Sequence, residues 1–294
     1  MGYGRWSDDH YKTYATSTKI ETLSREQVFT QRGIHSSLDP AKIMLRESCD
    51  SEANPNSTPA IFGLDVTGSM GFIAEHIAKQ GLGKLMAQII EEKPITDPHL
   101  MFMALGDIRS DDAPLQVSQF EPDIRIIEQL RNIYLEGRGG GNHTESYDLP
   151  WYFAAHRTLI DSFNKRGKKG YLFTIGDELP PDDKLPLYKL EGIFGNRDIP
   201  QPVSPVDLLI QAQQKYNVFH IIAEEGSECT RGFGTKAVRE AWVDLMGPNV
   251  IFMRDHTALT DIVVGVLKIS EGMSIEQAIK ECNRPLELKY ALDI

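Results

Sequence analysis

The sequence contains three short clusters of polar residues whose types and spacing suit the binding of a cation. The first is the run DVTGS, in which Asp65, Thr67 and Ser69 alternate around a bend that contains a glycine. A turn this tight can aim three oxygen-bearing side chains at one point. Carboxylate and hydroxyl oxygens are the ligands that a hard cation such as Mg²⁺ prefers, at about 2.0–2.1 Å and with several waters retained.

The other two clusters lie farther along the chain. The loop 139–146 (GGGNHTES) is rich in glycine and precedes a predicted helix, and the run 174–178 (TIGDE) ends a predicted strand. The triple glycine lets the backbone pass close to a ligand and adopt positive φ. We expect it to present Thr144 or Glu145 toward the site of the first cluster. Asp177 would add a second carboxylate, acting through water.

The elements around these clusters alternate between strands and helices, which favours a parallel sheet covered by helices on both faces. In such folds functional groups gather at the carboxyl ends of the strands, where all three clusters fall. The apolar patterns predict strands at 60–64, 99–105, 115–120, 170–175, 217–223 and 249–253. They predict helices at 72–92, 123–134, 146–164, 206–215, 235–245, 259–267 and 274–282.

The first 58 residues are mostly polar and their apolar runs are short, so we expect an N-terminal extension over 1–58. One short helix is predicted at 24–31. The pair Asp39-Pro40 suits a helix start, while the residues after it (AKIMLRES) could instead form an edge strand. The turn-rich stretch 50–59 marks a boundary. The main α/β domain is therefore predicted over 59–270, followed by a C-terminal helix and tail over 271–294.

Composition narrows the classes of function. The chain has 294 residues, of which 41% are hydrophobic and 25% charged, as in a globular protein. Its net charge of −11 argues against general binding of nucleic acid. The apolar runs are too short to span a membrane, and we expect no secretory signal. Three dispersed cysteines, Cys49, Cys229 and Cys282, indicate reduced thiols. We therefore expect a soluble cytoplasmic protein.

The three clusters together resemble the metal-ion-dependent adhesion site (MIDAS) of von Willebrand factor type A (vWA) domains. Asp65, Thr67 and Ser69 match the Asp-x-Ser/Thr-x-Ser motif of that family, and Asp177 matches its later strand-end aspartate. The middle loop departs from the family, because Asn142, Thr144 and Glu145 stand where some members have Asp, Pro and Glu. The resemblance covers residues 60–267 in the order and type of elements.

This resemblance implies a doubly wound, Rossmann-like fold and a protein-binding module without catalytic activity. In such domains Mg²⁺ or Mn²⁺ (or Ca²⁺) keeps an incomplete shell, which an acidic side chain of a partner protein completes. The implied metal residues are Asp65, Thr67, Ser69, Asp177 and either Thr144 or Glu145, with Glu145 slightly favoured. The resemblance gives no reason to expect nucleic-acid or membrane partners.

The main alternative is an enzyme, a Mg²⁺-dependent phosphatase of the haloacid dehalogenase type with Asp65 as nucleophile. Against it, position 66 is Val where that family has Lys, and position 67 carries no Asp to act as general acid. A serine hydrolase is less well supported, because Ser69 lacks the Gly-x-Ser-x-Gly flanks. The run DVTGS could also be a simple helix cap.

Three other polar groups near predicted strand ends have simpler interpretations. Glu224 and Glu225 are expected to form a solvated acidic turn, and His76 is expected to be structural. The run Arg254-Asp255-His256 suggests a salt bridge and a helix cap rather than a catalytic group.

Overall fold

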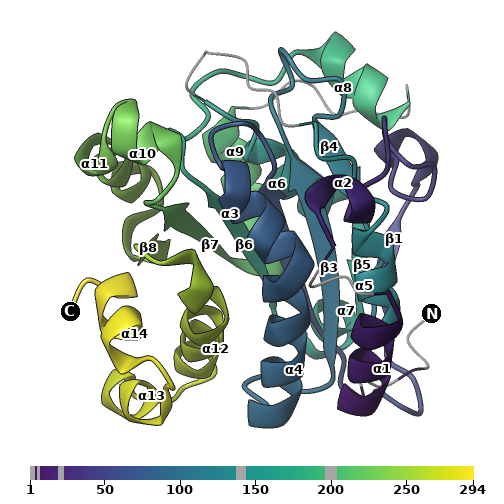
Figure 1. Cartoon of the computed structure of the whole chain (residues 1–294), viewed down its shortest axis with the longest axis vertical. Coiled ribbons are helices and arrows are strands. Elements are labelled where there is room, and N and C mark those ends of the chain that lie inside the picture. Colours follow the sequence, from purple (N-terminus) through teal and green to yellow (C-terminus); the bar gives the residue numbers. More distant parts are fainter. Residues whose placement is uncertain (1–3, 5–6, 19–22, 137–143, 196–203) are drawn as a thin grey trace.

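The computed structural model describes residues 4, 7–18, 23–136, 144–195 and 204–294. Its centre is a six-stranded sheet in the order β4-β3-β2-β6-β7-β8 (Figure 1). All neighbouring strands are parallel except β4, which runs antiparallel to β3. The strands are β2 (Thr58–Asp65), β3 (Pro98–Leu105), β4 (Leu115–Val117), β6 (Gly170–Gly176), β7 (Tyr216–Ala223) and β8 (Val250–Met253). The predicted mostly parallel α/β sheet is confirmed.

The strand order reverses beside β2. The chain first adds β3 and β4 on one side of β2, and then returns to add β6, β7 and β8 on the other side. The carboxyl ends of β2 and β6 therefore diverge into different connections and leave a crevice between them, which is where open α/β sheets place their ligands. Asp65 is the last residue of β2, and Asp177 directly follows β6.

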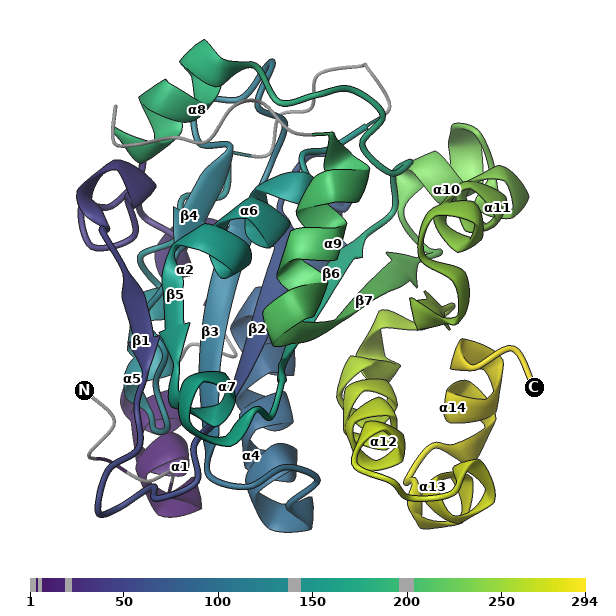
Figure 2. The same ribbon diagram turned by 180° about the vertical axis from the view of Figure 1, so that it is seen from behind.

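Helices cover both faces of the sheet, as Figures 1 and 2 show from opposite sides. Successive residues of β2 point to opposite faces: Phe62 joins the core with α3, α4 and α12, and Ile61 joins the core with α6, α9 and α11. The helices are α1 (Asp8–Thr18), α2 (Arg25–Val28), α3 (Gly71–His76), α4 (Leu82–Glu92), α5 (Arg125–Leu130), α6 (Asp148–His156), α7 (Asp161–Arg166), α8 (Leu187–Phe194), α9 (Pro205–Lys215), α10 (Ser227–Arg231), α11 (Thr235–Met246), α12 (Leu259–Ser270), α13 (Ile275–Glu281) and α14 (Pro285–Ala291).

A row of phenylalanines crosses the middle of the sheet. Phe62 of β2 lies in register with Phe102 of β3 and Phe173 of β6. Its ring is 5.7 Å from the first and 5.3 Å from the second, measured between centroids. Phe219 of β7 continues the row at 5.1 Å from Phe173. Aromatic pairs across neighbouring strands stabilise a sheet beyond the area that they bury, so this row fixes the register of the strands that carry Asp65 and Asp177.

The N-terminal residues pack on this domain. Val28 and Leu38 are buried in the core on the α4 side of the sheet. β1 (Arg46–Ser48) pairs in parallel with β5 (Thr158–Ile160) in a separate two-stranded sheet. Both alternatives for the Asp39-Pro40 region occur, since the Asp39 carboxylate caps a 3-10 turn at Pro40–Lys42 and the strand follows it. The helix predicted at 24–31 is present as the shorter α2. The division of the chain into domains stays a prediction.

The helix predicted at 146–164 is wrong. The chain forms α6, leaves it for β5, and then forms α7. The apolar spacing of this stretch fits one helix, but β5 finds a partner in β1, more than 100 residues earlier in the chain. A π-helical segment, Ile77–Gly81, also interrupts the helix predicted at 72–92. The helices α1, α8, α10 and α14 were not predicted. Within the described residues, no helix has the length and apolar character needed to cross a membrane.

The phenylalanine row gives a testable prediction. Phe62→Ala should lower the free energy of unfolding by about 3–5 kcal/mol, because it removes a fully buried ring and leaves a cavity. Phe72→Ala is the matched control: its side chain is 61% exposed, and we expect a change below about 1 kcal/mol. Urea unfolding in the presence of a chelator measures both. Equal losses in the two variants would contradict this account of the core.

Candidate functional site

The turn after β2 brings the first cluster of polar residues to one place. The Asp65 carboxylate is fully buried, and its Oδ1 accepts hydrogen bonds from the Thr67 backbone N–H at 2.9 Å and the Thr67 hydroxyl at 2.6 Å. The Thr67 hydroxyl lies 3.1 Å from the Ser69 hydroxyl. The chain thus folds back on Asp65 before α3 begins at Gly71. Three oxygen-bearing side chains form one connected series, as their alternate spacing predicts.

The third cluster joins this series through Asp177. The Ser69 hydroxyl donates a hydrogen bond of 2.7 Å to Asp177 Oδ1, while Asp177 Oδ2 accepts the backbone N–H of Glu228 at 2.8 Å. The close approach of the loop after β7 requires a glycine, because a Cβ at Gly226 would lie 2.3 Å from the Asp177 side chain. The ends of β2 and β6 are therefore connected through Asp65, Thr67, Ser69 and Asp177, which were grouped from the sequence.

The middle loop contributes Glu145. The expected glycine loop, Gly139–Gly141 with Asn142 and His143, lies outside the described residues. Glu145 is 2% exposed, and its Oε2 has no hydrogen-bond partner among the described residues. Thr144 is half-buried and forms a backbone bridge to Leu179. Of the two middle-loop candidates, Glu145 is the one with a buried and unsatisfied oxygen.

Glu178 is a fourth carboxyl group of this site, and sequence reasoning did not single it out. It is 8% exposed, and within the part of the chain that the structure describes its Oε2 also lacks a hydrogen-bond partner. The residue follows Asp177 directly, so its place beside a predicted site residue was the available signal. In a strand, neighbouring side chains point to opposite faces, so strand geometry would turn Glu178 away from Asp177. The strand ends at Gly176, so this rule does not apply to Glu178.

Burial, together with neighbouring carboxylates, raises the pKa values of all four carboxyl groups. Burial, together with the charge of Asp177, raises the pKa of Asp65 to about 7. Burial and the charge of Asp65 raise the pKa of Glu145 to about 11, and burial with Asp65 and Asp177 raises that of Glu178 to about 8. Burial also raises the pKa of Asp177. Within the ranges that the structure describes, none of the four forms an ion pair with a Lys, Arg or His.

This donor set fits a divalent cation. Carboxylates and hydroxyls are hard oxygen ligands, and the unpartnered oxygens of Glu145 and Glu178 are buried groups that need a donor or a cation. A hollow of about 20 Å³ beside Thr144 and Glu145 is also lined by Asp107, Arg109 and Lys184, and of the candidate ligands only Glu145 lines it. That volume is enough for about one water molecule. The residues that could hold the ion, directly or through water, are Asp65, Thr67, Ser69, Glu145, Asp177 and Glu178.

A layer of aromatic residues behind the carboxylates holds them in place, and it was not predicted. The Tyr147 hydroxyl donates a hydrogen bond of 2.9 Å to Asp65 Oδ2. Its ring packs edge-on against Trp242, whose indole N–H donates to the backbone carbonyl of Glu178. Gly176 is required here, because a Cβ at that position would lie 1.9 Å from the Tyr147 hydroxyl. The hydrogen bond from Tyr147 therefore holds the Asp65 carboxylate in position.

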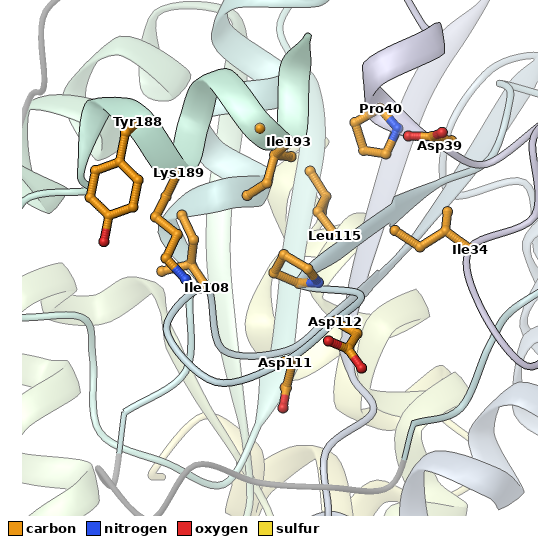
Figure 3. Close-up of a pocket in the computed structure, with 12 residues that line it drawn as sticks. Ile34, Asp39, Pro40, Ile108, Asp111, Asp112, Leu115, Tyr188, Lys189 and Ile193 are labelled. Atoms are coloured by element: carbon orange, nitrogen blue, oxygen red, sulfur yellow. The ribbon is translucent and has the colours of Figure 1, made fainter.

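The loop after β3 forms one wall of the site and separates it from a larger cavity. Asp107 and Asp111 of this loop add to the negative potential that raises the pKa of Glu145. On the other side of the loop, a cavity of about 260 Å³ lies between α8 and the N-terminal residues (Figure 3). It is lined by Ile34, Asp39, Pro40, Ile108, Asp111, Asp112, Pro114, Leu115, Tyr188, Lys189, Gly192 and Ile193.

The hydrogen bonds of Asp65 argue against the phosphatase alternative. A nucleophilic carboxylate needs an oxygen free to attack phosphorus. Both oxygens of Asp65 are occupied here, one by Thr67 and the other by Tyr147, and the side chain is fully buried. Ser69 likewise donates to a carboxylate, Asp177, instead of to a histidine base. The arrangement suits a fixed ligand set better than an attacking group.

Comparisons with known proteins agree with the fold. No family model and no curated protein matches the sequence. Among solved structures, the pilus adhesin SpaC from Lactobacillus rhamnosus GG in its open conformation matches with a TM-score of 0.50 and 9% identity, over 75% of this chain. A second form of SpaC matches at 0.47 with 7% identity, over 74% of this chain.

A von Willebrand factor type A protein from Catenulispora acidiphila matches at 0.37 with 15% identity, over 74% of this chain and 44% of its own. This chain spans 31% of the length of SpaC in both forms. At these identities the likeness to SpaC concerns the fold alone.

The raised pKa values predict how stability depends on pH without metal. Between the pKa of Glu145 in the unfolded chain, about 4.3, and its folded pKa of about 11, only the folded state holds this proton. Unfolding then releases a proton, so Glu145 lowers stability progressively as pH rises across that window. In a chelator, Glu145→Gln should show a smaller loss of stability than the unmodified protein between pH 7 and pH 9.

Urea unfolding at the two pH values measures this difference. Asp244→Asn, at an exposed acid of α11, serves as control and should keep the original slope. An unchanged slope in Glu145→Gln would contradict the burial of this carboxyl group beside Asp65.

Proposed function

We propose that this protein is a divalent-cation-dependent protein-binding module of the vWA type, without catalytic activity. Mg²⁺, or Mn²⁺ or Ca²⁺ in its place, would be held by Asp65, Thr67 and Ser69, with Asp177 acting through water. An acidic side chain of a protein partner would complete the metal shell. Neither nucleic acid nor membrane is part of this proposal, and the expected compartment is the cytoplasm.

The observation that carries the proposal is the gathering of Asp65, Glu145, Asp177 and Glu178 at one crevice without a basic partner among the described residues. Buried carboxylates normally pair with a cation or bind a metal. A divalent ion would be the largest local charge and would return these groups to their ionised forms. The two hydroxyls between the carboxylates supply neutral oxygens, so the ion keeps part of its charge for an incoming anion.

The middle ligand in this proposal is Glu145 and not Thr144. Glu145 has an oxygen without a hydrogen-bond partner among the described residues. Of the neighbouring carboxylates, Asp65 raises the pKa of Glu145 most. The position of Thr144 is set by its backbone bridge to Leu179. A partner bound at the ion would also meet the loop after β3, whose Asp107 and Asp111 make this rim negative.

The first test is thermal unfolding with and without Mg²⁺ or Mn²⁺. A ligand that binds only the folded state stabilises it by RT ln(1 + [L]/Kd), or about 2.7 kcal/mol at one hundred times Kd. We expect millimolar ion to raise Tm, and Asp65→Ala to abolish the increase. Asp244→Ala, at an exposed acid of α11 outside the ligand set, should keep it. The absence of any shift in the unmodified protein would remove the proposal.

A second test separates the two middle-loop residues and the enzyme alternative. Glu145→Gln should weaken the Mg²⁺ response, since it removes a charged ligand, whereas Thr144→Val should leave it nearly intact. The opposite result would move the ligand to Thr144. An aryl phosphate added to the metal-loaded protein should give no turnover, and turnover lost in Asp65→Asn would favour the phosphatase.

The binding role itself is tested by affinity capture from a cell extract. The unmodified protein should retain a partner in Mg²⁺ that is released by chelator, and Asp65→Ala should not retain it. Capture that is equal in the two proteins and insensitive to chelator would contradict a metal-dependent interface.

A further inference from the structure

A second group of potential metal ligands lies at the same edge of the sheet, beyond the ends of β7 and β8. Glu225 follows β7, His256 follows β8, and His76 ends α3. None of the three belongs to the Asp65 site. The π-helical segment that follows His76 packs against the 3-10 turn that begins at His256, which brings the two histidines together. π segments inside helices occur frequently at functional sites.

The ligand atoms of Glu225, Asp255 and His256 converge closely, and His76 lies outside that set with its ring against the ring of His256. His256 Nδ1 lies 2.7 Å from Glu225 Oε2, and the same oxygen accepts the His256 backbone N–H at 2.7 Å. One ligand atom each of Glu225, Asp255 and His256 lie within 4.8 Å of one another. The ring centroid of His76 is 4.7 Å from that of His256, with the two rings perpendicular. Two imidazoles that share an ion with bonds of about 2.0–2.1 Å have centroids at a comparable separation.

We propose that His76, Glu225 and His256 form a second metal site, which takes a transition-metal ion such as Zn²⁺ or Co²⁺ and not Mg²⁺. Two imidazoles and one carboxylate are the ligands that such ions select, whereas Mg²⁺ prefers oxygen alone. On binding, the ion takes the place of the hydrogen between His256 Nδ1 and Glu225, and the neutral imidazole carries its one hydrogen on Nε2. A proton is released to solvent only from a His256 that carried hydrogens on both nitrogens. Water fills the remaining positions of the ion.

Asp255 is the nearest further carboxylate, but its oxygens are already engaged. Its Oδ1 accepts from Thr257, and its Oδ2 pairs with Arg284 at 2.5 Å. Unlike Asp65, whose partners are neutral hydroxyls, Asp255 is already paired with the Arg284 cation, so it need not bind the ion. Phe72, in edge contact with His256, forms an apolar side of the site.

The experiment is titration with Zn²⁺ by calorimetry, and with Co²⁺ by visible absorption, in the Asp65→Ala protein. That background removes the proposed Mg²⁺ site, so the two proposals succeed or fail separately. We expect one equivalent of Zn²⁺ to bind. His76→Gln and His256→Gln should each weaken it by at least about tenfold, because even outer partners of metal ligands change affinity by about 10–100-fold. His156→Gln, on the outer side of α6, is the matched control and should not weaken it.

Two outcomes overturn the proposal: no binding of Zn²⁺ in the Asp65→Ala protein, or equal binding in His76→Gln and His156→Gln. Folding is checked by the thermal midpoints of the metal-free variants, which should agree within a few degrees. If Asp65→Ala does not fold, the same series is measured with Asp65 intact in excess Mg²⁺, where Zn²⁺ must still bind and His76→Gln must still weaken it.

Discussion

The arrangement of this protein depends on keeping four carboxyl groups together at one buried crevice. Asp65 and Asp177 come from the ends of adjacent strands, and each is fixed by donors that the fold places beside it. Like charges this close oppose folding unless they hold protons or share a cation. The sheet holds these carboxyl groups together although their mutual repulsion is unfavourable, and the Tyr147 hydroxyl and the N–H of Glu228 hold two of them in place. Carboxyl groups with such perturbed pKa values are typical of functional sites.

The parts of the site that follow from local sequence were predictable. Asp65, Thr67 and Ser69 lie within five residues, so one turn determines their contacts. Asp177 was predictable because parallel strands end at a common edge. Tyr147, Glu178 and Gly226 were not, because their contacts depend on how a helix and two loops pack over the sheet. Spacing along the chain carries no information on such contacts.

The fold also was predictable where it follows from local sequence and not where it depends on contacts between distant parts of the chain. Buried strands such as β2 and β6 are short apolar runs bounded by turns, and their type was predicted correctly. The stretch 146–164 was not, because Thr158–Ile160 forms a strand only through its pairing with Arg46–Ser48. Tertiary pairing here overrides a helical pattern. The N-terminal residues that supply the partner strand are also the part whose role the sequence left open.

The two proposed metal sites at the carboxyl edge differ in the chemistry of their side chains. Near β2 and β6, the described side chains in contact with the carboxylates are hydroxyls and a phenol, which favour hard cations. Beyond β7 and β8, imidazoles stand beside Glu225 and favour softer ions. The loop after β7 connects both sites, because the Ser227 backbone N–H donates to the carbonyl of Ser69. The same loop also holds Asp177, through the backbone N–H of Glu228. An ion bound to Glu225 would restrain this loop and would therefore affect the position of Asp177.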